Sequence, residues 1–376
     1  MGSFATCAAN AHEADFTDEG DHLTERIERL RERLKKESVD ALFLSSPSNR
    51  RYLTGFTGST GVVVVSQETV YMITDFRYFD QVSAESPHVE LVKSKNLLED
   101  FVTLIKERKE LRRIAFEAEH LTVNTYRAIE EKLPQHVLTP AVGWVEDLRT
   151  VKEPSEIAAI ERAVAVADRA FTYILDRLKG RTEREIALDL EFFMRNEGAE
   201  RLAFQSIVAS GPNGALPHAV PTDRVVAEGD FVTLDFGCVV DGYCSDMTRT
   251  VAVGKADDRQ REIYDLVLEA QEAGVKAVRA GLTGKEVDAA ARSIIEARGH
   301  GDHFGHGLGH GVGLDIHEAP RLAPKVESVL EPAMVTSVEP GIYLSGWGGV
   351  RIEDLVVVTQ EGRRVLTQSP KSLIEV

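Results

Sequence analysis

Four carboxylates and one histidine are spread over the C-terminal half of this 376-residue chain, each in a short apolar or glycine-rich segment. They are Asp235, Asp246, His310, Glu339 and Glu353. A charged side chain in such a segment has a large desolvation cost unless a positive group meets it. Carboxylate oxygens with one imidazole nitrogen form a donor set that suits divalent metal ions. The sequence therefore predicts that the five side chains converge on a pair of such ions.

The first two carboxylates lie on the two arms of a predicted β-hairpin. Its turn is Asp241-Gly242, a dipeptide typical of two-residue hairpin loops. Counting outward from this turn places Asp235 diagonal to Asp246 on one face, because side chains alternate between the faces of a strand. Either residue alone would be interpreted as a solvated strand residue. Two carboxylates on one face inside apolar runs favour a shared site.

A second hairpin-like stretch follows the same plan. It runs from Val335 to Val356 through a glycine-rich bend. Glu339 takes the place of Asp235, since a glycine follows each of them two residues later, and Glu353 takes the place of Asp246. We infer that the chain repeats itself and that each repeat donates a carboxylate pair.

Two helical segments support this internal repeat. Residues 180–186 and 281–287 share glycine, threonine, basic and glutamate positions, and a glycine follows each segment at the same distance, Gly198 and Gly299. Both segments contain the Thr-x-x-Glu pattern of a capping box, which opens an amphipathic helix. The C-terminal part of the chain is therefore predicted to be an α+β domain with an internal pseudo-twofold repeat.

Between the second helix and the second hairpin, glycine occupies every odd position from 305 to 313. In an extended chain this leaves one face without side chains, so we expect another part of the backbone to approach it closely. The opposite face carries His306, Leu308, His310, Val312 and Leu314. Five of the eleven histidines lie in residues 300–317. A surface histidine tract that binds metal adventitiously would explain neither the glycines nor the apolar residues.

Other catalytic patterns fit less well. His306 and His310 have the spacing of the ends of His-Glu-x-x-His, but Gly307 stands where the catalytic glutamate belongs, and the glycines oppose a helix. No Gly-x-Gly-x-x-Gly follows a predicted strand, and residues 281–285 lack the Walker A spacing. A serine nucleophile elbow is also absent. These patterns disfavour a single-zinc protease, a nucleotide-binding enzyme and a serine hydrolase.

Five short blocks together resemble the pita-bread metallopeptidases, the group of methionine aminopeptidase, aminopeptidase P, prolidase and the metal-free creatinase. The resemblance covers residues 150–376. The blocks are Leu-Asp-Phe-Gly at Asp235, Ser-Asp-Met-Thr-Arg-Thr at Asp246, His-Gly-Leu-Gly-His at His310, Val-Glu-Pro-Gly at Glu339 and Val-Arg-Ile-Glu-Asp at Glu353. The resemblance implies a pita-bread catalytic domain, and all five positions that hold metal in the family are filled.

The preceding part of the chain resembles the N-terminal domain of bacterial aminopeptidase P, mainly in residues 49–59 and 74–78. Helical and strand patterns alternate there as in an α/β domain. They predict a helix over 23–36 and strands over 41–44, 61–65, 70–74 and 114–116. Pro154 breaks any preceding helix and opens a long amphipathic one. We predict a flexible leader over residues 1–21, a creatinase-like α/β domain over 22–147 and the pita-bread domain over 148–376.

The resemblance also implies a role for each residue. Asp235 would chelate one metal ion, His310 and Glu339 the other, with Asp246 and Glu353 bridging both. The donor set suits Mn(II) and tolerates Co, Fe or Zn. Glu339 would also act as general base. The residues that match the family's polar residues around the metals are His218, His306, His317, Tyr343 and Arg351.

The expected substrate follows from the same resemblance. A bond before proline has no N–H on its leaving side, so proteases that dock substrates through backbone hydrogen bonds handle it poorly. Aminopeptidase P removes a residue that precedes proline, and prolidase cleaves only the Xaa-Pro dipeptide. The N-terminal blocks favour a short aminopeptidase P, with prolidase as the alternative. A methionine aminopeptidase and a non-catalytic peptide-binding relative are less favoured, because of the N-terminal domain and the complete ligand set respectively.

Composition limits the partners and the compartment. A net charge of −17 disfavours nucleic acid and anionic membranes as partners. The first 22 residues lack both lysine and arginine and any sustained apolar run, so they do not resemble a signal peptide. Three cysteines are too few for a disulfide framework, which makes a cytoplasmic location the expectation. Resemblance implies a homodimer or higher homo-oligomer that acts on small proline-containing peptides.

Overall fold

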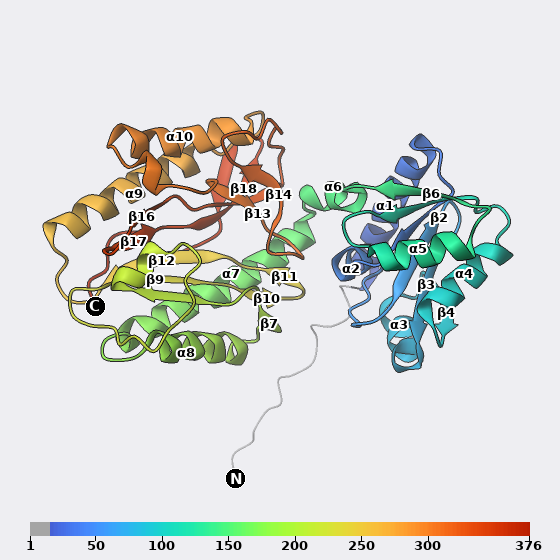
Figure 1. The fold of residues 1–376 in the computed structure, drawn as a ribbon, viewed down its shortest axis with the longest axis horizontal. Coiled ribbons are helices and arrows are strands. Elements are labelled where there is room, and N and C mark those ends of the chain that lie inside the picture. Colours follow the sequence, from blue (N-terminus) through green and yellow to red (C-terminus); the bar gives the residue numbers. More distant parts are fainter. Residues whose placement is uncertain (1–15) are drawn as a thin grey trace, which may run out of the picture. The chain divides into compact units, whose positions relative to one another are not determined.

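The computed structural model describes the backbone of residues 16–376 and the side chains from residue 22 onward. The chain divides between Leu148 and Arg149 into two compact units (Figure 1), and each unit is described by itself. In the described residues, no helix combines the length and the apolar composition needed to span a bilayer.

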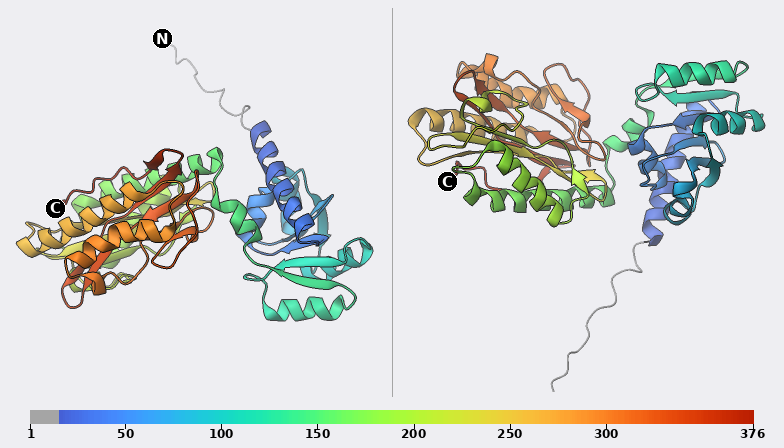
Figure 2. Two further views of the ribbon diagram at one scale, coloured as in Figure 1. Left: turned by 90° about the horizontal axis from the view of Figure 1, so that it is seen from above. Right: turned by 60° about the horizontal axis from the view of Figure 1, so that its bottom comes forward.

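The N-terminal unit is a mixed β-sheet with helices packed on it (Figure 2). The strands have the order β4-β3-β2-β1-β5-β6, and the central strand β1 pairs antiparallel to β2 and parallel to β5. Apolar residues of α4 and α5 share a buried cluster with β1, β2, β3 and β5. The elements are α1 (Phe16–Lys36), β1 (Ala41–Leu44), α2 (Pro47–Thr54), β2 (Val62–Ser66), β3 (Val70–Asp75), η1 (Phe76–Tyr78), α3 (Phe79–Glu85), β4 (Glu90–Ser94), α4 (Leu97–Glu107), β5 (Arg113–Glu117), α5 (Val123–Lys132), β6 (Val137–Ala141) and α6 (Trp144–Thr150).

The sequence predicted the inner elements of this unit better than the outer ones. Strand β1 has the predicted bounds, β3 differs from its prediction by one residue at one end, and β2 and β5 differ by one residue at each end. Helix α1 begins at Phe16, earlier than the predicted residue 23, so it includes the last part of the predicted leader. The rest of that leader, residues 1–15, lies outside the described residues. The sheet-edge strands β4 and β6 were not predicted, because each buries only one of its five residues.

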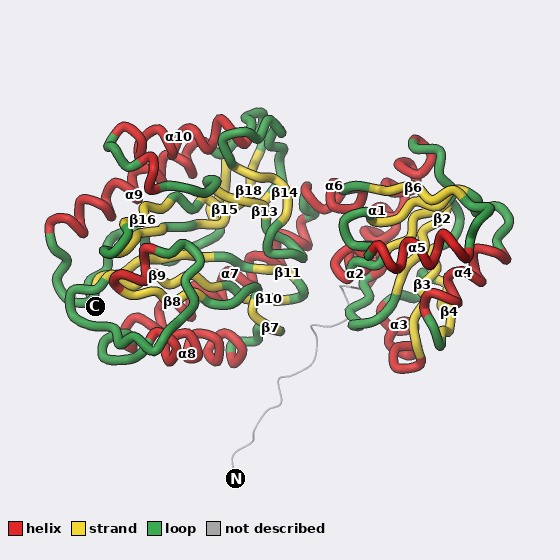
Figure 3. Tube along the Cα trace, viewed as in Figure 1, coloured by secondary structure: helices red, strands yellow, loops and turns green. Residues whose placement is uncertain are grey.

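The C-terminal unit holds the predicted catalytic half of the chain. It contains strands in several small sheets and four long helices, which Figure 3 separates by colour. The elements are α7 (Pro154–Ile174), η2 (Leu175–Arg177), α8 (Glu183–Asn196), β7 (Arg201–Leu202), β8 (Ile207–Ser210), η3 (Gly211–Ala215), β9 (Phe231–Phe236), β10 (Cys238–Val240), β11 (Tyr243–Cys244), β12 (Met247–Ala252), α9 (Asp258–Ala277), α10 (Gly284–Ala297), η4 (Gly301–His303), β13 (Gly309–Gly311), β14 (Glu318–Leu322), β15 (Val335–Val338), β16 (Gly341–Leu344), β17 (Gly348–Arg351), β18 (Asp354–Thr359) and β19 (Gly362–Val365).

The predicted internal repeat is confirmed in this unit. Helices α7 and α8 pack on one hairpin, and α9 and α10 lie on the opposite side of the strands (Figure 1). Helices α8 and α10 have 14 residues each, and each opens with a capping box, at Thr182 and Thr283. The glycines that follow them, Gly198 and Gly299, both have a positive φ, at 101° and 79°. Two similar halves therefore enclose the strands between them.

Each hairpin is interrupted at some of its acidic residues, although Asp235 lies within β9. In the first hairpin, Asp241 and Gly242 form the turn with positive φ values of 50° and 82°, as the dipeptide predicted. Strand β9 pairs with β12 so that Asp235 lies opposite Thr248, which confirms the diagonal position of Asp246. Asp246 lies in the gap between β11 and β12, and Glu353 lies in the corresponding gap between β17 and β18. Asp246 and Glu353 therefore occupy equivalent positions in the two hairpins.

Three of the five alternating glycines, Gly307, Gly309 and Gly311, meet other backbone, as predicted. A Cβ atom on Gly309 would lie 2.0 Å from the carbonyl oxygen of Ser337, and one on Gly311 would lie 2.0 Å from that of Ala319. The extended region is shorter than predicted, because only Gly309–Gly311 form strand β13 and its register shifts after His310. The predicted single lined face is therefore wrong. Leu308 and Val312 lie in the apolar core.

We expect Gly309→Ala to destabilise the C-terminal unit by about 1–3 kcal/mol, because its methyl group would overlap the Ser337 carbonyl. Gly305→Ala is the matched control, since nothing lies within 4 Å of a Cβ at that position. It should change stability by less than about 0.5 kcal/mol. Urea unfolding of the two variants measures the difference, and equal stabilities would contradict the close backbone approach.

Candidate active site

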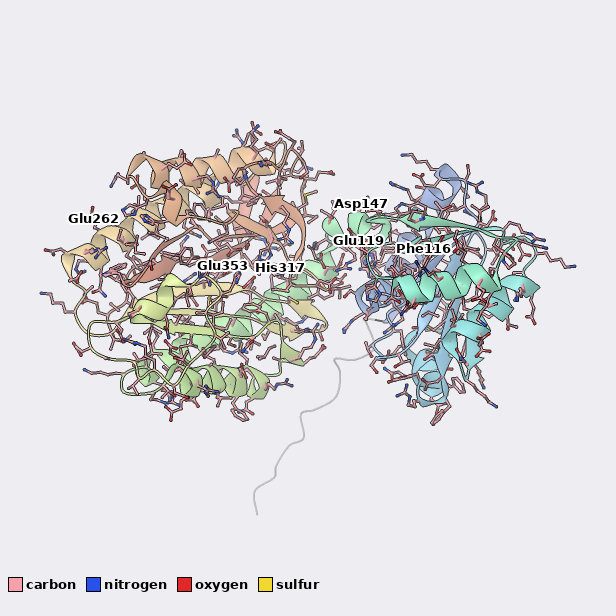
Figure 4. All side chains as sticks on the ribbon, in the orientation of Figure 1. Phe116, Glu119, Asp147, Glu262, His317 and Glu353 are labelled. Carbon is pink, nitrogen blue, oxygen red and sulfur yellow. The ribbon has the colours of Figure 1, made fainter. Side chains whose placement is uncertain are left out.

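All ten side chains that the sequence singled out line one cavity in the C-terminal unit. Its volume is about 660 Å³, and Figure 4 labels two of its residues, Glu353 and His317. The ten are His218, Asp235, Asp246, His306, His310, His317, Glu339, Tyr343, Arg351 and Glu353. These residues come from strands, strand gaps and loops far apart in the sequence. The tertiary fold brings them together.

The acidic side chains meet at the floor of this cavity. Asp235, Asp246 and Glu353 each offer one carboxylate oxygen, and these atoms all lie within 4.8 Å of one another. His310 Nε2 lies 3.6 Å from Asp246 Oδ2 and 3.3 Å from Glu339 Oε1. The five predicted metal-binding residues therefore form one cluster, with carboxylates from both halves of the repeat.

Hydrogen bonds hold His310 with one nitrogen aimed at the acids. Its Nδ1 lies 3.1 Å from the carbonyl oxygen of Gly311, which requires the proton on Nδ1 and leaves the Nε2 lone pair free to bind a cation. Its backbone N–H donates to Ser337 Oγ at 3.0 Å, and that hydroxyl donates to Glu339 Oε1 at 3.0 Å. Ser337 thus couples the position of His310 to that of Glu339.

The neighbouring side chains do not supply enough positive charge to neutralise these clustered acids. Burial raises the pKa of Asp246 well above its usual range, and the charges of Glu353, Asp235 and Glu339 raise it further. Burial and the charge of Glu339 do the same to the pKa of Glu353. Asp235 Oδ1 and Glu353 Oε1 are buried without a hydrogen-bond partner. Divalent cations at this position would remove the repulsion and coordinate both orphaned oxygens, so the residues fit such ions.

An arginine and a tyrosine link the acids to a histidine. Arg351 Nη2 donates to Asp235 Oδ2 at 2.5 Å, and its Nη1 donates to the Tyr343 hydroxyl at 2.8 Å. The same hydroxyl lies 2.9 Å from His306 Nε2. Arg351 Nε also donates to Thr248 Oγ1, which donates to Glu353 Oε2 at 2.7 Å. This network fixes the orientation of two acids and gives His306 a polar contact with the cavity.

Burial lowers the pKa values of two cavity histidines, His306 and His317. Burial, followed by the charges of His310 and Arg321, lowers the pKa of His317 to about 4. His218 and His317 are exposed at the rim. A neutral imidazole can donate a proton from one nitrogen and accept one at the other, as acid–base chemistry requires.

Sequence reasoning missed several residues that support the acids from behind. Arg249 is fully buried, and its guanidinium donates to the carbonyl oxygen of Glu353 and to Asp354 Oδ1, the latter at 2.8 Å. The other oxygen of Asp354 accepts from Gln271 and Lys371, both at 2.9 Å. Arg249 and Asp354 could have been found from the sequence, because they lie close after Asp246 and Glu353 in the chain. Nothing in the sequence pointed to Gln271 or Lys371, since they contact the site only through folding.

Arg321 is a further cation at the cavity that was not predicted. It lies opposite His310 in the β13–β14 pair and lines the cavity. Its side chain is exposed, and among the described residues no carboxylate forms an ion pair with it. An unpaired guanidinium beside an anion-rich floor can bind an anionic group of a ligand.

A buried ion cluster anchors the loop that carries His317. Glu318 Oε2 accepts from Lys152 Nζ at 3.0 Å, and Glu318 Oε1 accepts from Arg149. Arg149 also binds Asp315 Oδ2 at 2.7 Å, and the Asp315 N–H donates to Glu318 Oε1 at 3.0 Å. The start of the C-terminal unit is thereby tied to residues 315–318, which hold His317 at the rim.

Comparison with known proteins places this architecture in a family. Residues 158–360 match the metallopeptidase family M24, and residues 26–151 match the creatinase/prolidase N-terminal domain. The Xaa-Pro dipeptidase of Pyrococcus furiosus is 38% identical over 94% of this chain and 100% of its own length.

The chain superposes on solved structures over nearly its whole length. The Xaa-Pro dipeptidase from Bacillus anthracis superposes with a TM-score of 0.92 at 46% identity, covering 94% of this chain and 100% of that one. The X-Pro aminopeptidase from Thermotoga maritima gives 0.85 at 38% identity, covering 90% and 98%. With both domain matches and relatives of this similarity, the chain belongs to metallopeptidase family M24 and has the pita-bread fold preceded by a creatinase-type N-terminal domain.

Proposed function

We propose that the protein is a dinuclear metal-dependent peptidase that hydrolyses Xaa-Pro bonds and releases the residue before proline. The observation that carries this proposal is the convergence of four carboxylates and His310 at the floor of one cavity. The relatives named for Xaa-Pro substrates, at 38% and 46% identity, support the substrate class. The oxygen-rich donor set favours Mn(II), with Co, Zn and Fe as other candidates.

Asp235, Asp246, His310, Glu339 and Glu353 would hold the two ions. When bound, the ions supply Lewis acidity that lowers the pKa of an attacking water and polarises the scissile carbonyl. Glu339 would take up the proton removed from that water, and burial raises the pKa of its carboxyl group above its usual value, which favours that role. Ser337 keeps the Glu339 carboxylate in position through its 3.0 Å hydrogen bond.

The cavity histidines would complete the proton transfers. A tetrahedral oxyanion requires a hydrogen-bond donor, and the departing proline nitrogen requires a proton. His317 and His218 lie at the rim, where the substrate enters. His306 is held by the Tyr343 hydroxyl, which Arg351 orients in turn. These three histidines, with Tyr343 and Arg351, would therefore orient the peptide and supply the donors.

The unpaired Arg321 favours dipeptides over longer peptides. In an Xaa-Pro dipeptide, the proline carries the free carboxylate, which lies one residue beyond the scissile bond. Arg321 faces the cavity from the strand opposite His310 and, among the described residues, has no carboxylate to neutralise it. We therefore propose prolidase-type activity as the main reaction. Aminopeptidase P activity is the second candidate, supported by the relatives that bear that name and by the N-terminal blocks.

We expect Arg321→Met to lower kcat/KM for Ala-Pro by about 10- to 100-fold, because one charge-assisted hydrogen bond is worth about 1.5–3 kcal/mol. Ala-Pro-amide, which lacks the carboxylate, should be cleaved equally well by both forms. Lys325→Met, a neighbouring exposed cation outside the cavity lining, is the control. Chromatographic assays of both substrates measure the effect.

The results of these assays distinguish between the candidate activities. Faster cleavage of Ala-Pro-Ala than of Ala-Pro by the wild type would establish the aminopeptidase. An equal loss on both Ala-Pro substrates in Arg321→Met would exclude carboxylate binding by this residue. Release of methionine from Met-Ala-Ser, with no cleavage of the proline peptides, would reassign the enzyme as a methionine aminopeptidase. No cleavage of any peptide, with or without metal, would favour a peptide-binding protein.

A further inference from the structure

Two histidines outside the active-site cavity face each other with their ring nitrogens. His300 directly precedes η4 and His303 ends it, and their Nδ1 atoms lie 3.1 Å apart. The ring centroids are 5.2 Å apart, with an interplanar angle of 47°. Both side chains are half-buried, and neither lines the cavity that contains His306 and His310. The catalytic proposal therefore leaves this pair unexplained.

The spacing of the two nitrogens matches a chelating pair. Imidazole nitrogens bind zinc at about 2.0–2.1 Å, so two nitrogens 3.1 Å apart subtend an angle of about 100° at a shared ion. That angle lies between the square-planar and the tetrahedral values. A hydrogen bond between the rings uses one of the two lone pairs, whereas a shared ion uses both when the protons are on the Nε2 atoms.

The surroundings of His300 keep its ring in the metal-binding form. Burial and the neighbouring His303 lower the pKa of His300, so the ring is neutral at pH 7. Glu262 on α9 adds a negative charge whose field acts on His300, while Arg259 opposes it. Gly301, between the two histidines, stands against the Glu296 side chain, with a built Cβ only 3.0 Å from Glu296 Cγ. The negative charge that acts on His300 of the pair thus comes from Glu262 of α9.

We propose that His300 and His303 form a second metal site, selective for imidazole-preferring divalent ions such as Zn²⁺, Ni²⁺ and Cu²⁺. It differs in chemistry from the cavity floor, where four carboxylates and a single imidazole favour harder ions such as Mn²⁺. An ion here would fix η4 at the point where the chain leaves α10 and begins the segment that carries His306. Tyr343, the partner of His306, lies in β16, which packs against η4.

The test is zinc uptake by the Mn-loaded enzyme at a series of free zinc concentrations. Equilibrium dialysis followed by elemental mass spectrometry would count both metals in the wild type, His300→Asn and His303→Asn. His136→Asn, a histidine of the N-terminal unit, is the matched control. We expect the wild type and the control to bind one zinc ion more than either variant, whose affinity for that ion falls at least about tenfold. Manganese content and peptide hydrolysis without zinc should remain unchanged in both variants.

A second readout follows the ion at this site without relying on activity. Zinc should raise the midpoint of thermal unfolding in the wild type and not in His303→Asn, since binding only to the folded chain stabilises it. Equal zinc affinity in all four proteins would overturn the proposal. Zinc uptake that only replaces manganese, ion for ion and equally in every variant, would overturn it as well.

Discussion

Asp246→Asn should lower kcat for Xaa-Pro hydrolysis by about 10³-fold or more, because it removes one of the carboxylates that would hold the metal ions and so would weaken the Lewis acidity that bound ions supply. The substitution keeps the shape of the side chain, which is buried in the gap between β11 and β12. Steady-state assays with excess Mn(II) give the rate, and elemental analysis of the dialysed protein gives the metal content.

Stability of the metal-free protein tests the same cluster independently. The charges of Glu353, Asp235 and Glu339 all act against an ionised Asp246. Metal-free Asp246→Asn should therefore unfold at a higher urea concentration than the metal-free wild type, although it gains less from added Mn(II). Asp223→Ala is the control, since its side chain is 82% exposed. A variant with full activity, or with lower metal-free stability, would be inconsistent with a repulsive metal-binding cluster.

Glu318→Gln should destabilise the C-terminal unit by about 3–5 kcal/mol, the usual cost of leaving buried cations unpaired. Arg149 and Lys152, which both bind Glu318, have side chains that are only 4% and 1% exposed. Chemical unfolding followed separately for each unit gives the loss, since the two units can unfold in separate steps. Glu327→Gln, which breaks the exposed pair with Lys285, should change stability by less than about 1 kcal/mol.

The same residue makes part of the stability depend on pH. Burial raises the pKa of Glu318, but the charges of Lys152 and Arg149, together with hydrogen bonds to the carboxylate, lower it by more. The pKa in the folded chain therefore lies below its ordinary value. The stabilisation is complete above the pKa of the unfolded chain and is lost as the pH falls through the folded value. Wild type and Glu318→Gln should therefore converge in stability at low pH. A difference that stays constant down to that range would exclude the ionised cluster as its cause.

Local patterns in the sequence were sufficient to predict the carboxylate pairs. Asp241-Gly242 sets the turn, and the turn sets the register that aligns Asp235 and Asp246, because strand side chains alternate with a period of two. The capping boxes at Thr182 and Thr283 likewise depend on residues three positions apart. Such short-range determinants are visible without the fold.

Other features became visible only with the tertiary structure. The shift in β13 after His310, which sends Leu308 and Val312 into the core, depends on the backbone of Ser337 and Ala319. The edge strands β4 and β6 bury little surface, so their sequences lack the apolar pattern of the inner strands.

The sequence by itself predicted the five residues that converge in the cavity and the two repeats that supply them, because turn type, capping and alternation act over a few residues. Only the tertiary structure decided that Arg321 reaches the cavity without a partner among the described residues, and that Lys152 and Arg149 hold Glu318. These relations join segments that no local pattern connects, and they arise from the packing of the two halves and of the loops between them.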